Sequence, residues 1–350
     1  MACVRESPVA RAAIWVAVLG LVGETALGRE MTLVVRPQKI STEAGKYVLL
    51  PPAALRTEGD AVAWYKKAIQ ALPDGGRSDQ IQQWLKMPLE QLPVDEVEKV
   101  LTQHVEGFKC VAQAVKCREC KWPAWAPEAA LANPEGYTKL RSPIRLWARY
   151  EIAQENYEGA VLAMQTGFGM SAHLTQGTIL VQFLTGVSIA AAMCAEAGEF
   201  TQAREAPNLY AALAALPKPF TDVEKAIEID KKAALSSGQL TVQQIESQAS
   251  KASFDRVRIL ANRLDTDLAA LQCVEAIRSY AASHVGQLPQ TLAEIKEVPV
   301  PNDPASGAAF RYTRIVSRAV LESATSTGDQ KEALRCEIVM KDGEGPGGKN

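Results

Sequence analysis

The segment from Ser142 to Leu216 constrains most strongly how this chain can fold. It contains three apolar helical segments in succession, with few charges on their inner positions. A helix that is apolar over most of its surface must be surrounded by other helices, so this segment predicts the core of a mainly α protein. We expect the first helix to begin at Ser142-Pro143, because a serine cap followed by proline is typical of a helix start. Gly198 is the expected C-cap of the third.

A weak internal repeat lies inside this core segment. Residues 155–160 (Glu-Asn-Tyr-Glu-Gly-Ala) are echoed by residues 198–203 (Gly-Glu-Phe-Thr-Gln-Ala), with an aromatic residue and an alanine in the same relation. The pattern resembles the turn between the helices of tetratricopeptide repeats, although the interval between the two copies exceeds that family's period of about 34 residues. We therefore predict an irregular antiparallel helical-hairpin (tetratricopeptide-like) array.

Ile179 to Ala195, within the most apolar run of the core segment, can also be read as a membrane span. It contains Gln182 and is rich in alanine and glycine rather than leucine. A span needs about 20 strongly apolar residues, so we favour a buried core helix.

Amphipathic patterns extend the predicted array over residues 58–284. Apolar residues recur at spacings of three and four within residues 60–72, 94–115 and 254–280. This is the pattern of helices that bury one face. Prolines at positions 123, 127 and 134 predict that the segment from Lys121 to Arg141 is a loop around the outside of the array.

The first 28 residues have the features of a signal peptide. Arg5 and Arg11 accompany an apolar run at residues 12–22, and Ala26-Leu27-Gly28 supplies the small residues that a signal peptidase reads. We predict export to the periplasm or the extracellular space of a bacterial cell. No stable membrane span is expected after cleavage, because the run is too short. An uncleaved N-terminal anchor is the alternative.

Composition limits the classes of partner. The 350 residues carry 38 basic and 40 acidic side chains, a net charge of −2, so there is no electrostatic footprint for nucleic acid. A hydrophobic content of 47% is enough for a sizeable core.

Residues 29–57 are predicted to be an extended N-terminal segment, in which Met31 to Val35 form a short strand or an extended arm.

The C-terminal part changes character after His284. Residues 285–342 are predicted to be a small α/β tail with a two-stranded hairpin, formed by the β-rich runs Phe310 to Val320 and Leu334 to Met340. Residues 343–350 are polar and glycine-rich, and we expect them to be disordered.

The tail also resembles known proteins. The residues that carry this likeness follow a long helix in a fixed order: Gly286, Leu288, Pro289, Asp303, Pro304, Ser306, Gly307, Phe310 and Tyr312. They resemble the tails of an uncharacterised family of exported helical proteins of planctomycete-type bacteria, for which no activity is implied. They are also similar to the tails of type II secretion pseudopilins, where an Asp-Pro turn follows a long helix. This second likeness implies a component of a membrane-anchored secretion apparatus. A true pseudopilin, however, carries this tail directly behind an N-terminal methylated helix, and this chain does not.

Three cysteines form a candidate thiol cluster: Cys110, Cys117 and Cys120. With His104 they include soft ligands at the spacing of a zinc knuckle. However, His104 and Cys110 point to different sides of one predicted helix, so convergence on one ion is unfavourable. A disulfide and free buried thiols are the other interpretations. In an oxidising compartment we expect at least one of the three to be oxidised, which would pin the segment from Lys121 to Arg141.

Asp303 is the other candidate site residue. Together with Asn302 and nearby carbonyl groups it could bind calcium, but an Asx–Pro turn that fixes the following strand is the favoured interpretation.

No sequence motif specifies a reaction. The glycine pattern at residues 167–172 lies in a predicted helix without a preceding strand, so it is not a dinucleotide loop. We predict no cofactor and no metal. The expected function is an exported, non-catalytic helical scaffold or binding protein of the cell envelope, with a protein or peptide partner. An exported enzyme whose site is distributed over several helices and a pseudopilin-related secretion component are the alternatives. The oligomeric state is left open.

Overall fold

The computed structural model describes residues 29–41, 46–73, 78–123, 127–236, 241–324 and 333–341. This part of the chain is mainly helical with a small sheet, as the sequence predicts. The predicted signal peptide at residues 1–28 and the predicted disorder at residues 343–350 lie outside the described residues.

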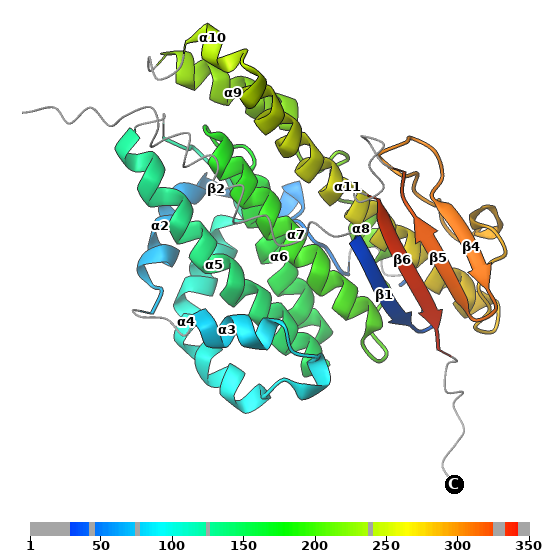
Figure 1. The fold of residues 1–350 in the computed structure, drawn as a ribbon. Helices are drawn as coiled ribbons and strands as arrows, with labels where there is room; N and C mark the ends of the chain where they lie inside the picture. Colours follow the sequence, from blue (N-terminus) through cyan, green and yellow to red (C-terminus); the bar gives the residue numbers. More distant parts are fainter. Residues whose placement is uncertain are drawn as a thin grey trace, which may run out of the picture.

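Three helices form the centre of the helical layer (Figure 1). These are α5 (Pro127–Ala153), α6 (Tyr157–Leu174) and α7 (Leu180–Gln202), and each packs against the other two. Buried residues cover most of the circumference of α6 and α7, including Phe168, Met193 and Phe200. The prediction that residues 142–216 build the core is confirmed.

Helices from the N-terminal third cover one side of this centre. Helix α4 (Val94–Ala114) packs on α2 (Ala61–Gln70) and α5, and α3 (Ser78–Leu85) also packs on α5. The carboxylate of Asp60 caps α2 by accepting a hydrogen bond from the backbone N–H of Val62. A short parallel pair, β2 (Thr57–Asp60) and β3 (Cys117–Glu119), joins the start of α2 to the end of α4.

Two predicted helix boundaries are wrong. Helix α5 begins at Pro127, so the predicted loop over residues 121–141 is helical from residue 127 onward, and Pro143 lies inside a helix. Tyr137, Leu140 and Ile144 are buried at helical spacing, and their burial outweighs the roughly 3 kcal/mol cost of an internal proline. Helix α7 continues past Gly198 to Gln202, because Phe200 and Thr201 are buried in the same helix.

The C-terminal third of the helical part is dominated by one long helix. Helix α11 (Gln248–Ser283) follows α8 (Tyr210–Ala214), α9 (Val223–Ser236) and α10 (Val242–Ile245). Helices α9 and α10 and the first half of α11 form a hairpin whose far end extends beyond the helical centre, while α9 contacts the start of α7 (Figure 1). The second half of α11 contacts α7, α8 and the sheet.

The sheet has four strands in the order β1-β6-β5-β4. The predicted two-stranded hairpin is wrong, because the chain reverses at Val316 and Ser317 and divides the first β-rich run into two strands. The strands are β1 (Arg29–Val35), β4 (Arg311–Ile315), β5 (Arg318–Glu322) and β6 (Leu334–Met340). Strand β1 pairs in parallel with β6, so the N-terminal segment completes the tail sheet.

The two faces of the sheet differ. One face packs on α11 through buried residues such as Leu33, Leu321 and Ile338. The other face carries a cross-strand row, Arg311, Glu322, Arg335 and Glu30, in which the charges alternate. The N–O distances along this row are 3.8, 2.8 and 4.0 Å.

Among the described helices, α7 is the one long and apolar enough to cross a membrane. Its most apolar 18-residue window is 67% buried inside the protein, as expected of a core helix. This composition is weak evidence for a span.

Candidate functional site

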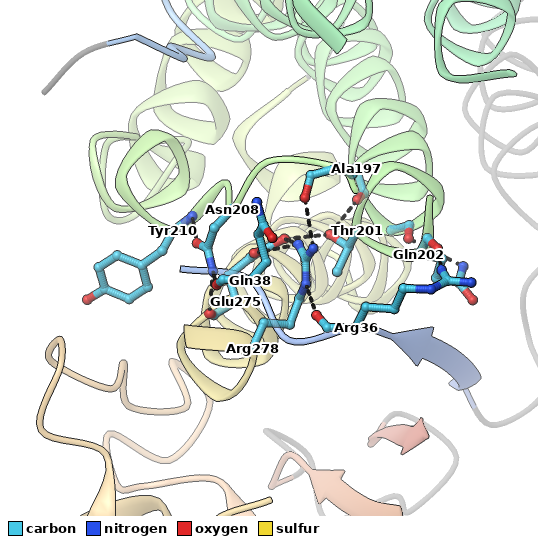
Figure 2. Close-up of polar contacts among 11 residues, drawn as sticks. Arg36, Gln38, Ala197, Thr201, Gln202, Asn208, Tyr210, Glu275 and Arg278 are labelled. Carbon is cyan, nitrogen blue, oxygen red and sulfur yellow. Dashed lines mark hydrogen bonds and ion pairs between the residues drawn. The ribbon is translucent and has the colours of Figure 1, made fainter. Parts of the chain in front are cut away.

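The densest buried polar cluster centres on Arg278 of α11 (Figure 2). Its Nη1 donates hydrogen bonds of 2.9 Å to both carboxylate oxygens of Glu275, one helical turn earlier. Both side chains are buried. A charge-assisted pair of this kind is stronger than a neutral hydrogen bond, and in the interior it must satisfy the remaining donors as well.

The other donors of Arg278 reach two different segments. Its Nε donates to the carbonyl oxygen of Arg36 at 3.0 Å, and its Nη2 donates to that of Ala206 at 2.9 Å. The backbone N–H of Gln38 in turn donates to the carbonyl oxygen of Arg278 at 3.1 Å. The guanidinium therefore fixes the residues that follow β1 and the residues that follow α7 to one point on α11.

Two further side chains, Thr201 and Asn208, contact this pair. We call the four residues Thr201, Asn208, Glu275 and Arg278 the Arg278 cluster. The Thr201 hydroxyl lies 2.8 Å from Glu275 Oε1. Asn208 Nδ2 donates to the carbonyl oxygens of Glu275, at 2.9 Å, and Gln38, at 3.0 Å. Figure 2 shows these groups pointing toward one another from α7, α11 and the connecting segments. The cluster joins elements, and both of its charged side chains are buried.

A second buried carboxylate, Glu196 of α7, is paired with two arginines of α5. Arg145 Nε lies 2.6 Å and Arg149 Nη1 3.4 Å from its oxygens. Arg149 also donates to the carbonyl oxygen of Met87. Burial raises the pKa of Glu196, and the two arginines act in the opposite direction. This pair holds α5 against α7.

An aromatic cluster, the Tyr65 cluster, consists of Tyr65, Trp122, Tyr137 and His173. The Tyr65 ring stacks on Trp122 with centroids 6.1 Å apart and meets Tyr137 edge-on at 5.8 Å. The Tyr65 hydroxyl lies 2.9 Å from His173 Nδ1, and Trp122 Nε1 donates to the His173 carbonyl at 2.8 Å. Among the described residues, the buried Tyr137 hydroxyl has no hydrogen-bond partner.

Burial keeps the ionisable groups of the Tyr65 cluster neutral. It is the main cause that lowers the pKa of His173 to about 4, and the positive charge of Arg56 acts in the same direction. Burial also raises the pKa of Tyr65 well above its ordinary value. A neutral imidazole and a protonated phenol therefore share this hydrogen bond at pH 7.

The predicted thiol cluster lies partly against these aromatic residues. Cys117, on β3, is buried, and Cys110 and Cys120 are half-buried. All three carry free thiols in the structure. Burial, with a further contribution from Asp60, raises the pKa of Cys117 and of Cys120, so both are protonated at neutral pH and weakly nucleophilic. Oxidation of one of these three cysteines stays a prediction. Residues 127–141 of the segment that the oxidised cysteine was expected to pin belong to helix α5.

The zinc interpretation finds no geometric counterpart. His104 Nδ1 lies 2.9 Å from the carbonyl oxygen of Val100 on its own helix, and its ring stacks on Phe108. Among the described residues there is no group of three or more histidine, cysteine or acidic side chains placed to hold a metal ion.

Asp303 lies in a turn in which its carboxylate binds backbone and hydroxyl donors. Oδ1 accepts from the N–H of Ala305 at 3.0 Å, and Oδ2 accepts from Ser306 Oγ at 3.1 Å and the N–H of Ala324 at 2.7 Å. The residue is buried. These contacts fix the approach to β4 and the exit from β5, which is the turn role expected for Asp303.

Sequence reasoning missed the Arg278 and Tyr65 clusters. A signal for the first was present: residues 268–281 of α11 are almost all apolar or small except for Glu275 and Arg278, which are three residues apart. A helix buried on most sides must pair such charges. The second cluster joins residues 108 positions apart in the chain, and no local pattern predicts that contact.

Comparison with known proteins adds no relative. No family model matches the chain. No curated protein and no solved structure matches it either. The likeness of the tail to secreted planctomycete-type proteins and to pseudopilins therefore stays a prediction from the sequence.

Proposed function

We propose that this protein is an exported, non-catalytic helical scaffold or binding protein of the bacterial cell envelope, with a protein or peptide as its partner. One observation carries the proposal: the buried charges of the described residues connect structural elements. Glu275 faces Arg278, and Glu196 faces Arg145 and Arg149. In a catalytic centre, perturbed ionisable groups converge on the position of a reacting atom. Here the buried carboxylates Glu275 and Glu196 each converge on arginine side chains.

The shape of the helical part supports a binding role. We infer that α5, α6 and α7 pair in the manner of tetratricopeptide hairpins, whose arrays use extended surfaces to bind peptides and proteins. The far end of the hairpin of α9, α10 and α11 extends beyond this centre (Figure 1). Leu235 and Val242 are exposed near its end. Apolar side chains on such an element are suited to contact a partner.

Site-specific photo-crosslinking in the cell envelope tests this proposal. A photoreactive residue at position 235 or 242 is expected to give a discrete protein adduct. The same residue in place of Leu55, which is also exposed but lies near β2, serves as the matched control. Adducts of equal yield at all three positions, or none at any of them, would contradict the proposal.

The enzyme alternative has one specific observation in its favour. The neutral His173 imidazole and the Tyr65 hydroxyl form a pair of the type used in proton transfer. Tyr65 is fully buried and His173 is half-buried, so only the imidazole is partly accessible to a substrate in solution. Turnover in a hydrolase screen that disappears in His173→Gln would favour this alternative.

A freely soluble mature monomer would count against the secretion-apparatus alternative.

A further inference from the structure

The most exposed large apolar residues of the described chain are two valines in an unusual backbone conformation. Val285 is 96% exposed and Val316 is 84% exposed. Both have a positive φ, 53° and 55°. A β-branched residue is strained in this region, which glycine or asparagine adopts more readily. Each valine therefore has a local conformational cost, and neither recovers it by packing inside the protein.

Both valines lie at the same end of the sheet. Val316 is in the turn between β4 and β5, and the neighbouring Ser317 carbonyl accepts a hydrogen bond from Met340 at the end of β6. Strands β1, β4 and β6 all run toward this end (Figure 1). Val285 follows α11, and a Cβ on the adjacent Gly286 would meet Pro37, just beyond β1, at 3.9 Å.

A third aliphatic residue and several cations accompany the valines. Ile315 is 56% exposed and precedes Val316. Arg314 and Arg318 flank this tip, and the exposed Lys341 follows β6. Arg314 Nε donates to the carbonyl oxygen of Val316 at 3.2 Å, which holds the guanidinium beside the tip. Two carboxylates lie nearby: Glu337 pairs with Arg318 at 3.1 Å, and Glu297 lies 3.6 Å from His284, which carries a charge only when it is protonated.

We propose that this end of the sheet, the valine patch (Val285, Ile315 and Val316), contacts the surface of an anionic lipid bilayer. Aliphatic side chains on protruding turns can enter the boundary between headgroups and acyl chains, while flanking arginine and lysine side chains bind lipid phosphates. The charges at the patch are complementary to such a surface. The inference goes beyond the proposed function, because it concerns a different surface from the helical hairpin.

A second copy of the chain fits the patch less well. A specific protein interface buries about 800 Å² on each partner and is enriched in aromatic residues. Three aliphatic side chains on separate turns supply far less area and no aromatic ring. Insertion into a lipid interface requires only a few apolar side chains, since each methylene that enters contributes separately.

Vesicle binding of the full chain tests the proposal. The double variant Val285→Asn/Val316→Asn is compared with wild type on vesicles of phosphatidylglycerol and phosphatidylethanolamine. We expect its partition coefficient to fall about tenfold, and its melting temperature to be maintained or raised, because asparagine tolerates positive φ. Leu55→Asn is the matched control, since Leu55 is 67% exposed but lies near β2, outside both proposed surfaces. It should bind like wild type.

The apolar run at residues 12–22 can itself enter a bilayer, so a local measurement is also needed. Val316→Trp adds tryptophan emission to the wild-type background, and we expect brominated lipids to quench this added emission. Leu55→Trp should show no such quenching. Absence of quenching at position 316, or equal quenching at both positions, overturns the proposal. Concentration-dependent dimerisation without lipid that Val316→Asn abolishes would also overturn it and assign the patch to a second copy.

Discussion

The Arg278 cluster and the Tyr65 cluster bury ionisable groups in two opposite ways. The first keeps its charges and pairs them: Arg278 donates to both carboxylate oxygens of Glu275 and to two backbone carbonyls. The second removes the charge: burial lowers the pKa of His173 to about 4, and the imidazole shares a neutral hydrogen bond with Tyr65. The difference follows from the residues of each cluster. Arg278 has the Glu275 carboxylate within hydrogen-bond distance, whereas His173 lies beside the aromatic ring of Tyr65, which in turn packs on Trp122 and Tyr137.

This difference determines how each region responds to change. A paired charge is sensitive to loss of its partner and insensitive to moderate changes of pH. A site that holds a neutral histidine tolerates another neutral side chain, but protonation of the histidine destabilises the folded state. The Arg278 cluster therefore behaves as a fixed connection between β1 and the helices, and the Tyr65 cluster as a contact that weakens in acid.

The largest expected effect is that of Arg278→Met. The substitution leaves Glu275 buried without its cation, and we expect the free energy of unfolding to fall by about 3–5 kcal/mol. The double variant Glu275→Leu/Arg278→Met should recover most of this loss, because no charge stays unpaired. Urea denaturation measures both values.

An exposed pair of the same chemistry is the matched control for that prediction. Arg258 binds Glu224 with N–O distances of 2.6 and 2.9 Å, but it lies at the surface. Arg258→Met should cost about 1 kcal/mol or less. Equal losses at Arg278 and Arg258 would show that burial of the Arg278 cluster is not what makes it important.

The next effect is the acid response of the Tyr65 cluster. Between pH 6.5 and about 4 the unfolded chain binds a proton at His173 that the folded chain does not, so this residue makes stability fall as pH falls. The contribution is up to about 3 kcal/mol across that window. His173→Gln removes the proton-binding group. The difference in unfolding free energy between variant and wild type should therefore change across this window and be constant above pH 7.

A third and smaller effect has the opposite sign. Burial raises the pKa of Asp230, whose Oδ1 accepts from the N–H of Leu180 at the start of α7, to about 6. The folded state therefore favours the protonated acid, and this residue makes stability fall as pH rises from about 4 to 6. Asp230→Asn keeps an acceptor for Leu180 and should raise the unfolding free energy at pH 7 by about 1–2 kcal/mol. No gain at pH 7, or a gain that persists at pH 4, would contradict the assignment.

Sequence reasoning found the elements that bury apolar stripes. The helices α2, α4 and α11 lie where spacings of three and four residues predict them, because burial of one face determines both the pattern and the helix. The start of α5 was missed because Pro123, Pro127 and Pro134 suggest a loop when they are read locally. Packing of Tyr137, Leu140 and Ile144 decides the outcome, and that packing involves helices distant in sequence.

The sheet and the polar clusters were beyond local patterns for the same reason. Strand β1 pairs with β6 across some 300 residues, and the Arg278 cluster joins residues 36, 38, 201, 208, 275 and 278. Neither contact leaves a periodic signal in the chain. The three cysteines and Asp303 were singled out because cysteine and aspartate are residue types that commonly form disulfides, bind metals or start turns. The residues that organise the interior, Glu275 and Arg278, are recognisable only once their helix is known to be buried on most sides.

The smallest expected effect concerns the charged row on the outer face of the sheet, which is the exposed counterpart of the Arg278 cluster. Arg335 lies between Glu322 and Glu30, at 2.8 and 4.0 Å, and nearly half of its side chain is exposed to water. Water and salt screen these pairs, so Arg335→Gln should lower the unfolding free energy by less than about 1 kcal/mol. The loss should shrink further in 1 M salt, where the screening length is about 3 Å. Arg278→Met should keep its full effect in the same salt, because its charges are inaccessible to counterions. If the two variants respond equally to salt, the contrast between buried and exposed pairs does not hold, and the connection between β1 and α11 depends on packing rather than on charge.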